Sequence, residues 1–409
     1  MKIVLAPDSF KGSISARDLC AAIRRGILAI APDIDVVELP LADGGEGTME
    51  NLVHATNGKI VECIVHDPLG RPIQSAYGIL GDETTVVIEM AKASGLPLLQ
   101  ADERDPLVTS SYGTGELISH ALGAGYRRFI VGLGGSATND GGAGMLKALG
   151  VQFFDHAGRE LSDGGAALEG LALINASGLD QRLSESRFTI ASDVTNPLCG
   201  TEGASAVFGP QKGATPEMVK QLDRALDHFG GQIAALTGND VRKLPGSGAA
   251  GGMGAALLAF LHADFKPGIE LVMEAIQFSD KLQGADLIIT GEGKLDTQTL
   301  SGKVIAGVCR QARQQGIATV ALCGGMELAT EQMEQIGLLA GFSIVPKPCS
   351  LEQAMEQAAV WAEKQAEQLV RLLYLRSTLH LGEEEKHATQ SVYHAKDSGI
   401  SSGQASREL

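Results

Sequence analysis

Carboxylates, hydroxyls and lysines gather in three glycine-containing loops, each of which follows a short apolar run. The first loop carries Asp8, Ser9, Lys11 and Ser13, the second carries Asp43 and Glu46, and the third carries Glu292 and is followed by Asp296 and Lys303. Carboxylates are typical Mg²⁺ ligands, and cations and hydroxyls bind phosphate oxygens. These residue types indicate phosphoryl transfer, which depends on positioning and charge neutralisation more than on covalent chemistry.

Each residue of these loops receives a provisional role. Asp43, Glu46, Glu292 and Asp296 are candidate metal ligands, Lys11 and Asp8 are candidate catalytic residues, and Ser9, Ser13 and Lys303 are candidate phosphate or substrate ligands. Taken singly, Asp8 or Ser9 could equally begin a turn, and Lys11 could be a solvated surface charge. It is the clustering of the three loops that favours a functional site.

Alternating apolar runs and amphipathic stretches predict how these loops are positioned. Strands are expected at 2–6, 34–39, 286–290, 318–323 and 342–345, and helices at 15–30, 48–56, 304–315, 331–339 and 351–373. Ser15 and Asp18 form a predicted cap for the first helix. Together they predict one five-stranded, doubly wound parallel sheet of flavodoxin-like type, in which ligands bind beyond the carboxyl ends of the strands.

The length of 409 residues favours two domains. We predict a discontinuous flavodoxin-like α/β domain at 1–58 and 284–375, interrupted by a second α/β domain at 59–283 whose paired strands begin at 60–80. The polar segment 376–409 is predicted to be a disordered tail. A cleft between the two domains is the expected place for the active site.

The predicted inserted domain contains a second loop of interest, the glycine-rich segment 134–144 after an apolar run at 129–133. Its Gly134, Gly135, Ser136, Thr138 and Asn139 offer backbone N–H groups and polar side chains to an anion, although tight packing turns are the alternative explanation.

Two further residues of the predicted inserted domain are candidate site residues. Asp193 follows the apolar run 188–191 and is the candidate general base, with an Asx turn before Asn196-Pro197 as the alternative. Lys212 is a cation in a rigid Gly-Pro-Gln-Lys-Gly turn and is a candidate phosphate ligand.

A competing pattern lies in the same place. Gly132 to Ala137 matches the G-x-G-x-x-A dinucleotide fingerprint, so an NAD-dependent oxidoreductase is the alternative. The Thr-Asn-Asp-Gly-Gly that follows is a poor helix opening, which argues against it. A non-catalytic anion-binding protein is a third reading, but such a protein does not need so many carboxylates. No P-loop, H-E-x-x-H or G-x-S-x-G motif is present.

The composition restricts the classes of ligand and partner that we expect. The net charge of −16 disfavours nucleic acid and anionic lipid, and it leaves a small anionic substrate open. The six cysteines contain no C-x-x-C pair, so neither a zinc site nor a disulfide framework is indicated. The absence of a long apolar run predicts a cytoplasmic protein without a membrane segment. The composition is compatible with a homo-oligomer.

Six motifs, taken together, resemble the type I glycerate kinase family over about residues 1–373. They are APDSFKGS from Ala6, ADGGEGT from Ala42, GGSATNDGGAG from Gly134, DVTNPL from Asp193, FGPQKGA from Phe208, and TGEG from Thr290 with Asp296-Thr-Gln298. The resemblance implies ATP-dependent, Mg²⁺-dependent phosphorylation of D-glycerate, with 2-phosphoglycerate as the favoured product, in the breakdown of glycolate, glyoxylate or sugar acids. It also implies a flavodoxin-like domain interrupted by a second domain. The segment after about Leu375 does not resemble the family.

Overall fold

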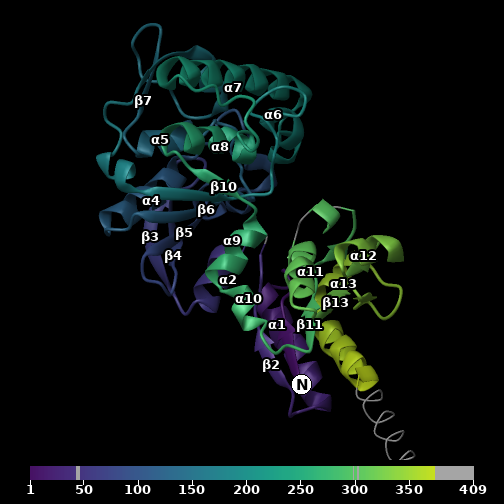
Figure 1. Ribbon diagram of the computed structural model, residues 1–409. Helices are drawn as coiled ribbons and strands as arrows, with labels where there is room; N and C mark the ends of the chain where they lie inside the picture. The colour runs from purple at the N-terminus through teal and green to yellow at the C-terminus, as the bar shows by residue number, and fades with distance from the viewer. Residues whose placement is uncertain (43–46, 298, 302–303, 374–409) are drawn as a thin grey trace, which may run out of the picture.

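The computed structural model describes residues 1–42, 47–297, 299–301 and 304–373 (Figure 1). Asp43, Glu46, Lys303 and the predicted tail 376–409 therefore lie outside the described residues. Among the described helices, none is both long and apolar enough to cross a bilayer.

One sheet combines strands from both ends of the chain. Its order is β15-β13-β11-β1-β2, and every neighbouring pair is parallel. The strands are β1 (Lys2–Leu5), β2 (Asp35–Glu38), β11 (Leu287–Thr290), β13 (Ala318–Cys323) and β15 (Ala340–Ser343). Counted within this sheet, the order is 2-1-3-4-5, which is the flavodoxin-like order. The predicted fold class is confirmed, whereas the exact domain boundaries stay a prediction.

Helices cover both faces of this sheet. Helix α1 (Ala16–Ile30) and the helical residues 358–373 share a core with one face, and α9 (Gly268–Ala275) and α11 (Val304–Gln314) share a core with the other. The predicted cap is present, since Ser15 Oγ accepts a hydrogen bond from the backbone N–H of Asp18 at 3.1 Å. Burial of apolar stripes on both faces of a parallel sheet accounts for the stability of this layer arrangement.

The predicted helix at 351–373 is interrupted at Gln357. Its first part, α13 (Leu351–Glu356), lies over the loop after β1, where a Cβ placed on Gly12 would be 3.2 Å from the Met355 methyl. The second part packs against α1, with Gly26 close to the Glu363 backbone. The two helical pieces thus pack against different parts of the protein.

The second sheet has six strands in the order β10-β9-β6-β5-β4-β3. These are β10 (Asp264–Lys266), β9 (Arg187–Ala191), β6 (Arg128–Gly132), β5 (Thr85–Glu89), β4 (Pro72–Ile79) and β3 (Lys59–His66). The four strands from β10 to β5 are parallel, and β4 and β3 complete the sheet as an antiparallel hairpin. Helices α4 (Tyr112–Gly123), α5 (Ala143–Ala148), α7 (Pro216–Thr237) and α8 (Ala249–Phe260) share a core with one face.

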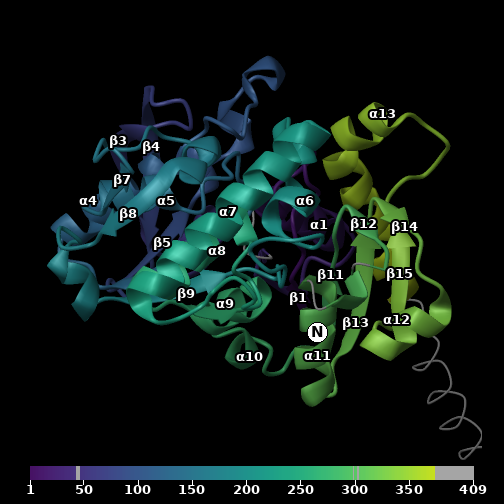
Figure 2. The ribbon, with the colours of Figure 1, turned by 90° about the horizontal axis from the view of Figure 1, so that it is seen from above.

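The two sheets are joined through a shared layer of helices. Helix α2 (Thr48–Ala55) and α9 pack on the remaining face of the six-stranded sheet, and their apolar side chains share one core with β1 and β11. Figure 1 shows α2 and α9 between the two bodies, and Figure 2 shows β3, β4 and β5 on one side of the molecule and β13 and β15 on the other. The chain passes between the sheets at these same two places, after α2 and after β10.

The remaining elements are short. They are α3 (Ala91–Ser94), α6 (Ala204–Phe208), α10 (Phe278–Lys281), α12 (Thr330–Ile336), and the paired strands β7 (Gln152–Asp155) with β8 (Leu171–Asn175) and β12 (Lys294–Leu295) with β14 (Gly325–Met326).

Candidate active site

A cavity of about 600 Å³ lies at the carboxyl end of the five-stranded sheet, between the loops that follow β1 and β11. Six predicted site residues line it: Asp8, Ser9, Lys11, Ser13, Glu292 and Asp296. The loops are 280 residues apart in sequence but adjacent in space, because β1 and β11 are parallel neighbours. Their gathering agrees with the position expected from the sequence, and their individual roles stay predictions.

Backbone contacts hold the first loop in place. The Asp8 N–H donates to the Gly291 carbonyl at 2.8 Å, and Asp8 Oδ1 accepts a hydrogen bond from the Ser9 N–H at 2.7 Å. Ser13 Oγ donates to the Met355 carbonyl at 2.7 Å. Asp8 is only 6% exposed. The loop is therefore anchored to the next strand and to α13 with its carboxylate held at the edge of the cavity.

Glu292 is held in a comparable way on the other side. The carboxylate is 8% exposed, and its Oε1 accepts a short hydrogen bond from Thr299 Oγ1. Thr299 Oγ1 in turn accepts from the Asp296 N–H at 3.2 Å. The Asp296 carboxylate lies 3.7 Å from Lys294 Nζ. One threonine thus fixes the spacing of the two predicted metal ligands.

The cavity also has an apolar part. Phe10, Ile344, Val345, Leu351, Ala354, Met355 and Ala358 line it. A cavity lined by carboxylates, hydroxyls and lysines together with several apolar side chains suits a ligand with one charged and one apolar part. A nucleoside phosphate has this character.

The residues at the cavity are compatible with Mg²⁺ bound together with a phosphate ligand. Among the described residues there is no group of three or more His, Cys, Asp or Glu side chains arranged to hold a metal by themselves. Magnesium in kinases is usually held by one or two carboxylates plus substrate phosphates, so one or two of the carboxylates at this cavity, Asp8, Glu292 and Asp296, would be enough when a nucleotide supplies the other ligands.

The glycine-rich loop follows β6 at the carboxyl end of the six-stranded sheet. Gly134 and Gly135 lead into it, and Gly135 has a φ of 73°, which favours glycine. Thr138 and Asn139 are completely buried, and Asn139 Nδ2 donates to Ser205 Oγ at 2.9 Å. Thr138 Oγ1 and Asn139 Oδ1 have no hydrogen-bond partner within the described part of the chain. Buried polar atoms left in this state indicate a loop shaped by more than packing.

Lys212 lies beneath this loop and is 1% exposed. Its Nζ donates to Ser136 Oγ at 2.8 Å and to the Thr138 carbonyl at 2.6 Å. Burial lowers the pKa of Lys212 to about 7, against the opposing effect of the Asp140 carboxylate. These contacts support the loop from inside the protein, and the predicted contact with a phosphate stays untested.

Asp193 lies beyond the end of β9. Its Oδ1 accepts a hydrogen bond from the N–H of Gly268, the first residue of α9, at 3.3 Å. Asp193 is not one of the described residues that line the cavity containing Asp8. The candidate base thus follows a strand of the six-stranded sheet, whereas the first cluster follows strands of the five-stranded sheet.

Sequence reasoning missed Glu89, the last residue of β5. It is 3% exposed and accepts a hydrogen bond from the Met49 N–H in the first turn of α2 at 2.7 Å. Burial raises the pKa of Glu89 to about 7, although the Met49 hydrogen bond opposes this shift. The signal was available: a lone acid ends the apolar run 85–88, as Asp193 follows the run 188–191. The hydrogen bond from Met49 to Glu89 joins the six-stranded sheet to α2. Helix α2 follows the segment that contains Asp43 and Glu46.

The dinucleotide fingerprint lacks its usual structural setting. After β6 the chain turns through the buried loop, and α5 begins only at Ala143. In a dinucleotide-binding domain a helix opens within the fingerprint and its N-terminus binds the pyrophosphate. The oxidoreductase alternative has no support here.

Comparisons with known proteins agree on one family. The glycerate kinase family matches residues 3–374. Glycerate kinase of Bacillus subtilis (strain 168) is 49% identical over 93% of this chain and 100% of its own length, and glycerate 2-kinase of Escherichia coli (strain K12) is 47% identical over 88% of this chain and 94% of its own. A crystal structure from Salmonella typhimurium LT2, provisionally assigned as glycerate kinase 2, superposes with a TM-score of 0.82 and 49% identity, covering 92% of this chain and 99% of that one. The chain belongs to the glycerate kinase family.

Proposed function

We propose that the protein transfers the γ-phosphoryl group of ATP to a hydroxyl group of D-glycerate, with 2-phosphoglycerate as the favoured product and the cytoplasm as the expected site of the reaction. The observation that carries the proposal is the cavity that joins Asp8, Lys11 and Glu292 to an apolar wall in a chain of this family. The relatives named glycerate kinase and glycerate 2-kinase support the substrate and the favoured hydroxyl.

We assign the nucleotide to this cavity. The apolar side chains of Leu351, Met355 and Ala358 would contact the base, and the polar wall would receive the phosphates. Lys11 neutralises phosphate charge there, and Ser9 and Ser13 are the hydroxyl-bearing residues of the same loop. Mg²⁺, when bound to the nucleotide, would be held by one or two of Asp8, Glu292 and Asp296 together with phosphate oxygens and would neutralise charge on the transferred group.

Glycerate is assigned to the edge of the six-stranded sheet. The glycine-rich loop from Gly134 to Asn139 would present backbone N–H groups to the substrate carboxylate or to the transferred phosphoryl group. Lys212 holds that loop through Ser136 and Thr138. Asp193 is the proposed general base, which accepts the proton of the glycerate hydroxyl as the phosphoryl group arrives. Asp8 and Asp296 are its rivals for this role.

The first experiment is a coupled assay of ADP release with D-glycerate and Mg²⁺, alongside reactions without glycerate and a titration with NADH. Saturable, glycerate-dependent ADP formation without NADH binding is expected. ADP release at the same rate without glycerate would contradict a glycerate kinase. Phosphorus NMR of the product then distinguishes 2-phosphoglycerate from the 3-isomer.

A further inference from the structure

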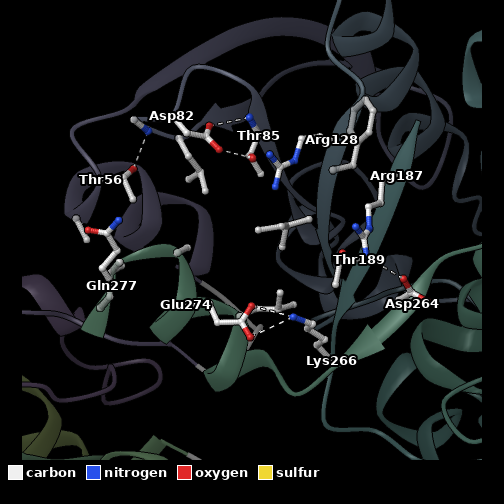
Figure 3. A pocket seen from close by; sticks show the side chains of 18 of the residues that line it. Thr56, Asp82, Thr85, Arg128, Arg187, Thr189, Asp264, Lys266, Glu274 and Gln277 are labelled. Atoms are coloured by element: carbon white, nitrogen blue, oxygen red, sulfur yellow. Dashed lines mark hydrogen bonds and ion pairs between the residues drawn. The ribbon is translucent and has the colours of Figure 1, made fainter. Parts of the chain in front are cut away.

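A second cavity, of about 670 Å³, lies at the amino end of the six-stranded sheet, whereas the glycine-rich loop and Asp193 follow the carboxyl ends of its strands (Figure 3). The first residues of four parallel strands line it, together with the ends of α2 and α9. Neither the phosphoryl-transfer proposal nor family membership gives this cavity a role.

Strand register places two arginines side by side in this cavity. Arg128 begins β6 and Arg187 begins β9, and the two are register partners, so their side chains leave the same face of the sheet. Thr85 of β5 is the register partner of Arg128 on its other side. Like charges on directly neighbouring strand positions are destabilising unless something neutralises them.

The protein does little to neutralise this pair. Among the described residues Arg128 has no ion-pair partner, and Arg187 has only Asp264, at 3.8 Å, with both side chains largely exposed. An exposed ion pair at that distance contributes little. In Figure 3 the Arg128 guanidinium points into the open space, and Arg187 is directed toward Asp264.

The other charged groups around the cavity leave it positive. Lys266 and Lys281 add two cations, and Asp82, Asp264 and Glu274 are the acids, so four basic side chains face three acidic ones. Lys266 pairs with Glu274 at 2.8 Å, and Asp82 is occupied by hydrogen bonds from Thr84 and Thr85. Lys281 Nζ lies 3.4 Å from the Ala55 carbonyl and so covers the negative end of α2. A locally positive cavity is unexpected in a protein of net charge −16.

We propose that this cavity is a binding site for a small organic phosphate, whose phosphate group lies between Arg128 and Arg187. Two planar guanidinium groups can each donate two parallel hydrogen bonds to phosphate oxygens, a geometry that lysine does not offer. The cavity volume is larger than inorganic phosphate requires, which leaves room for a small carbon skeleton beside Gln277 and Thr189. The two segments that connect the sheets, after α2 and after β10, both border the cavity. A bound ligand would therefore contact the six-stranded sheet and both connecting segments.

Isothermal titration of the full chain at constant ionic strength tests the proposal. The probes are inorganic phosphate, 2-phosphoglycerate and D-glycerate, added to a Lys11→Ala background that weakens phosphate binding in the candidate active site. Saturable binding of phosphate and tighter binding of 2-phosphoglycerate are expected to remain in this background. Adding Arg128→Gln and Arg187→Gln should weaken both by at least tenfold, because two charge-assisted contacts are lost. Arg224→Gln, whose partner Glu169 lies elsewhere on the surface, is the matched control and should change neither.

A folding readout accompanies the titration. Without phosphate, Arg128→Gln should melt at the same temperature as the parent or slightly higher, since it relieves like-charge repulsion. A clearly lower melting temperature, unchanged phosphate affinity in the double arginine variant, or glycerate binding that the two arginine substitutions weaken as much as phosphate binding would each overturn the proposed site.

Discussion

The loop after β1 and the glycine-rich loop after β6 contain similar residue types in opposite environments. Lys11 lies on a cavity wall and is exposed, whereas Lys212 is buried and bonded to its own protein through Ser136 and Thr138. A charge on a cavity wall can contact a ligand that enters the cavity, and a buried charge that is hydrogen-bonded to the protein fixes the backbone around it. The comparison teaches that one chemical type can serve binding in one loop and preorganisation in another.

The largest expected effect concerns the base that would act between these two loops. Asp193→Asn keeps the shape and the hydrogen bond from Gly268 but removes the basicity, so kcat should fall by roughly 10²- to 10⁴-fold. Steady-state kinetics across a Mg²⁺ titration measures this. If most of kcat survives and only the Mg²⁺ requirement rises, Asp193 is a metal ligand and the base is to be sought at Asp8 or Asp296.

Lys11→Ala tests the exposed side of the comparison. We expect kcat/KM to fall by about 10²-fold or more, similar to the loss of one preorganised donor, with an unchanged melting temperature. Thermal melting and kinetics on the same preparation make the distinction. A variant with near-normal kinetics would mean that Lys11 is an ordinary solvated surface residue.

Lys212→Met tests the buried lysine, and its effect should appear in the pH dependence of the free energy of unfolding. The pKa of Lys212 is lowered to about 7 by burial, so between pH 7 and its ordinary value near 10.5 the unfolded chain binds more protons than the native one. The wild-type free energy of unfolding should therefore rise relative to the variant as pH increases, by on the order of 2 kcal/mol between pH 7 and 9. Denaturant unfolding of both proteins at each pH measures the difference. Parallel pH profiles of the two proteins would contradict a buried Lys212 whose pKa is lowered.

Glu89→Gln extends the comparison to a buried acid and should give the smallest effect, with the opposite sign. Burial raises the Glu89 pKa to about 7, so between its ordinary value near 4.5 and pH 7 the native state binds the additional proton. Wild-type stability relative to the variant should fall by about 1–2 kcal/mol as pH rises from about 5.5 to 7, because ionised Glu89 is buried. Glu62→Gln is the control, because Glu62 is an exposed acid of β3 whose carboxylate accepts a hydrogen bond from Gln74. A pH-independent difference would show that Glu89 does not titrate there.

Much of the architecture was predictable from local patterns. Apolar runs and helical periodicity predicted the five parallel strands, and the rule that ligands bind at the carboxyl ends of such strands predicted that Asp8, Lys11 and Glu292 share one site. Ser15 was predictable as a cap because its hydrogen bond reaches only three residues along the chain. These properties depend on neighbours in sequence and on a general rule of sheet geometry.

Burial and pairing across long distances in sequence were decided by the tertiary structure alone. Lys212 contacts Ser136 across 76 residues, and Glu89 contacts Met49 across 40, so no local pattern distinguishes these buried ionisable groups from exposed ones. The neighbouring positions of Arg128 and Arg187 likewise follow from the register of β6 and β9, which the packing of the whole six-stranded sheet sets. Sequence by itself determined the family, the flavodoxin-like sheet and the polar loops at its edge. Only the folded chain decided which charges face a ligand, because desolvation and charge proximity are properties of three-dimensional packing.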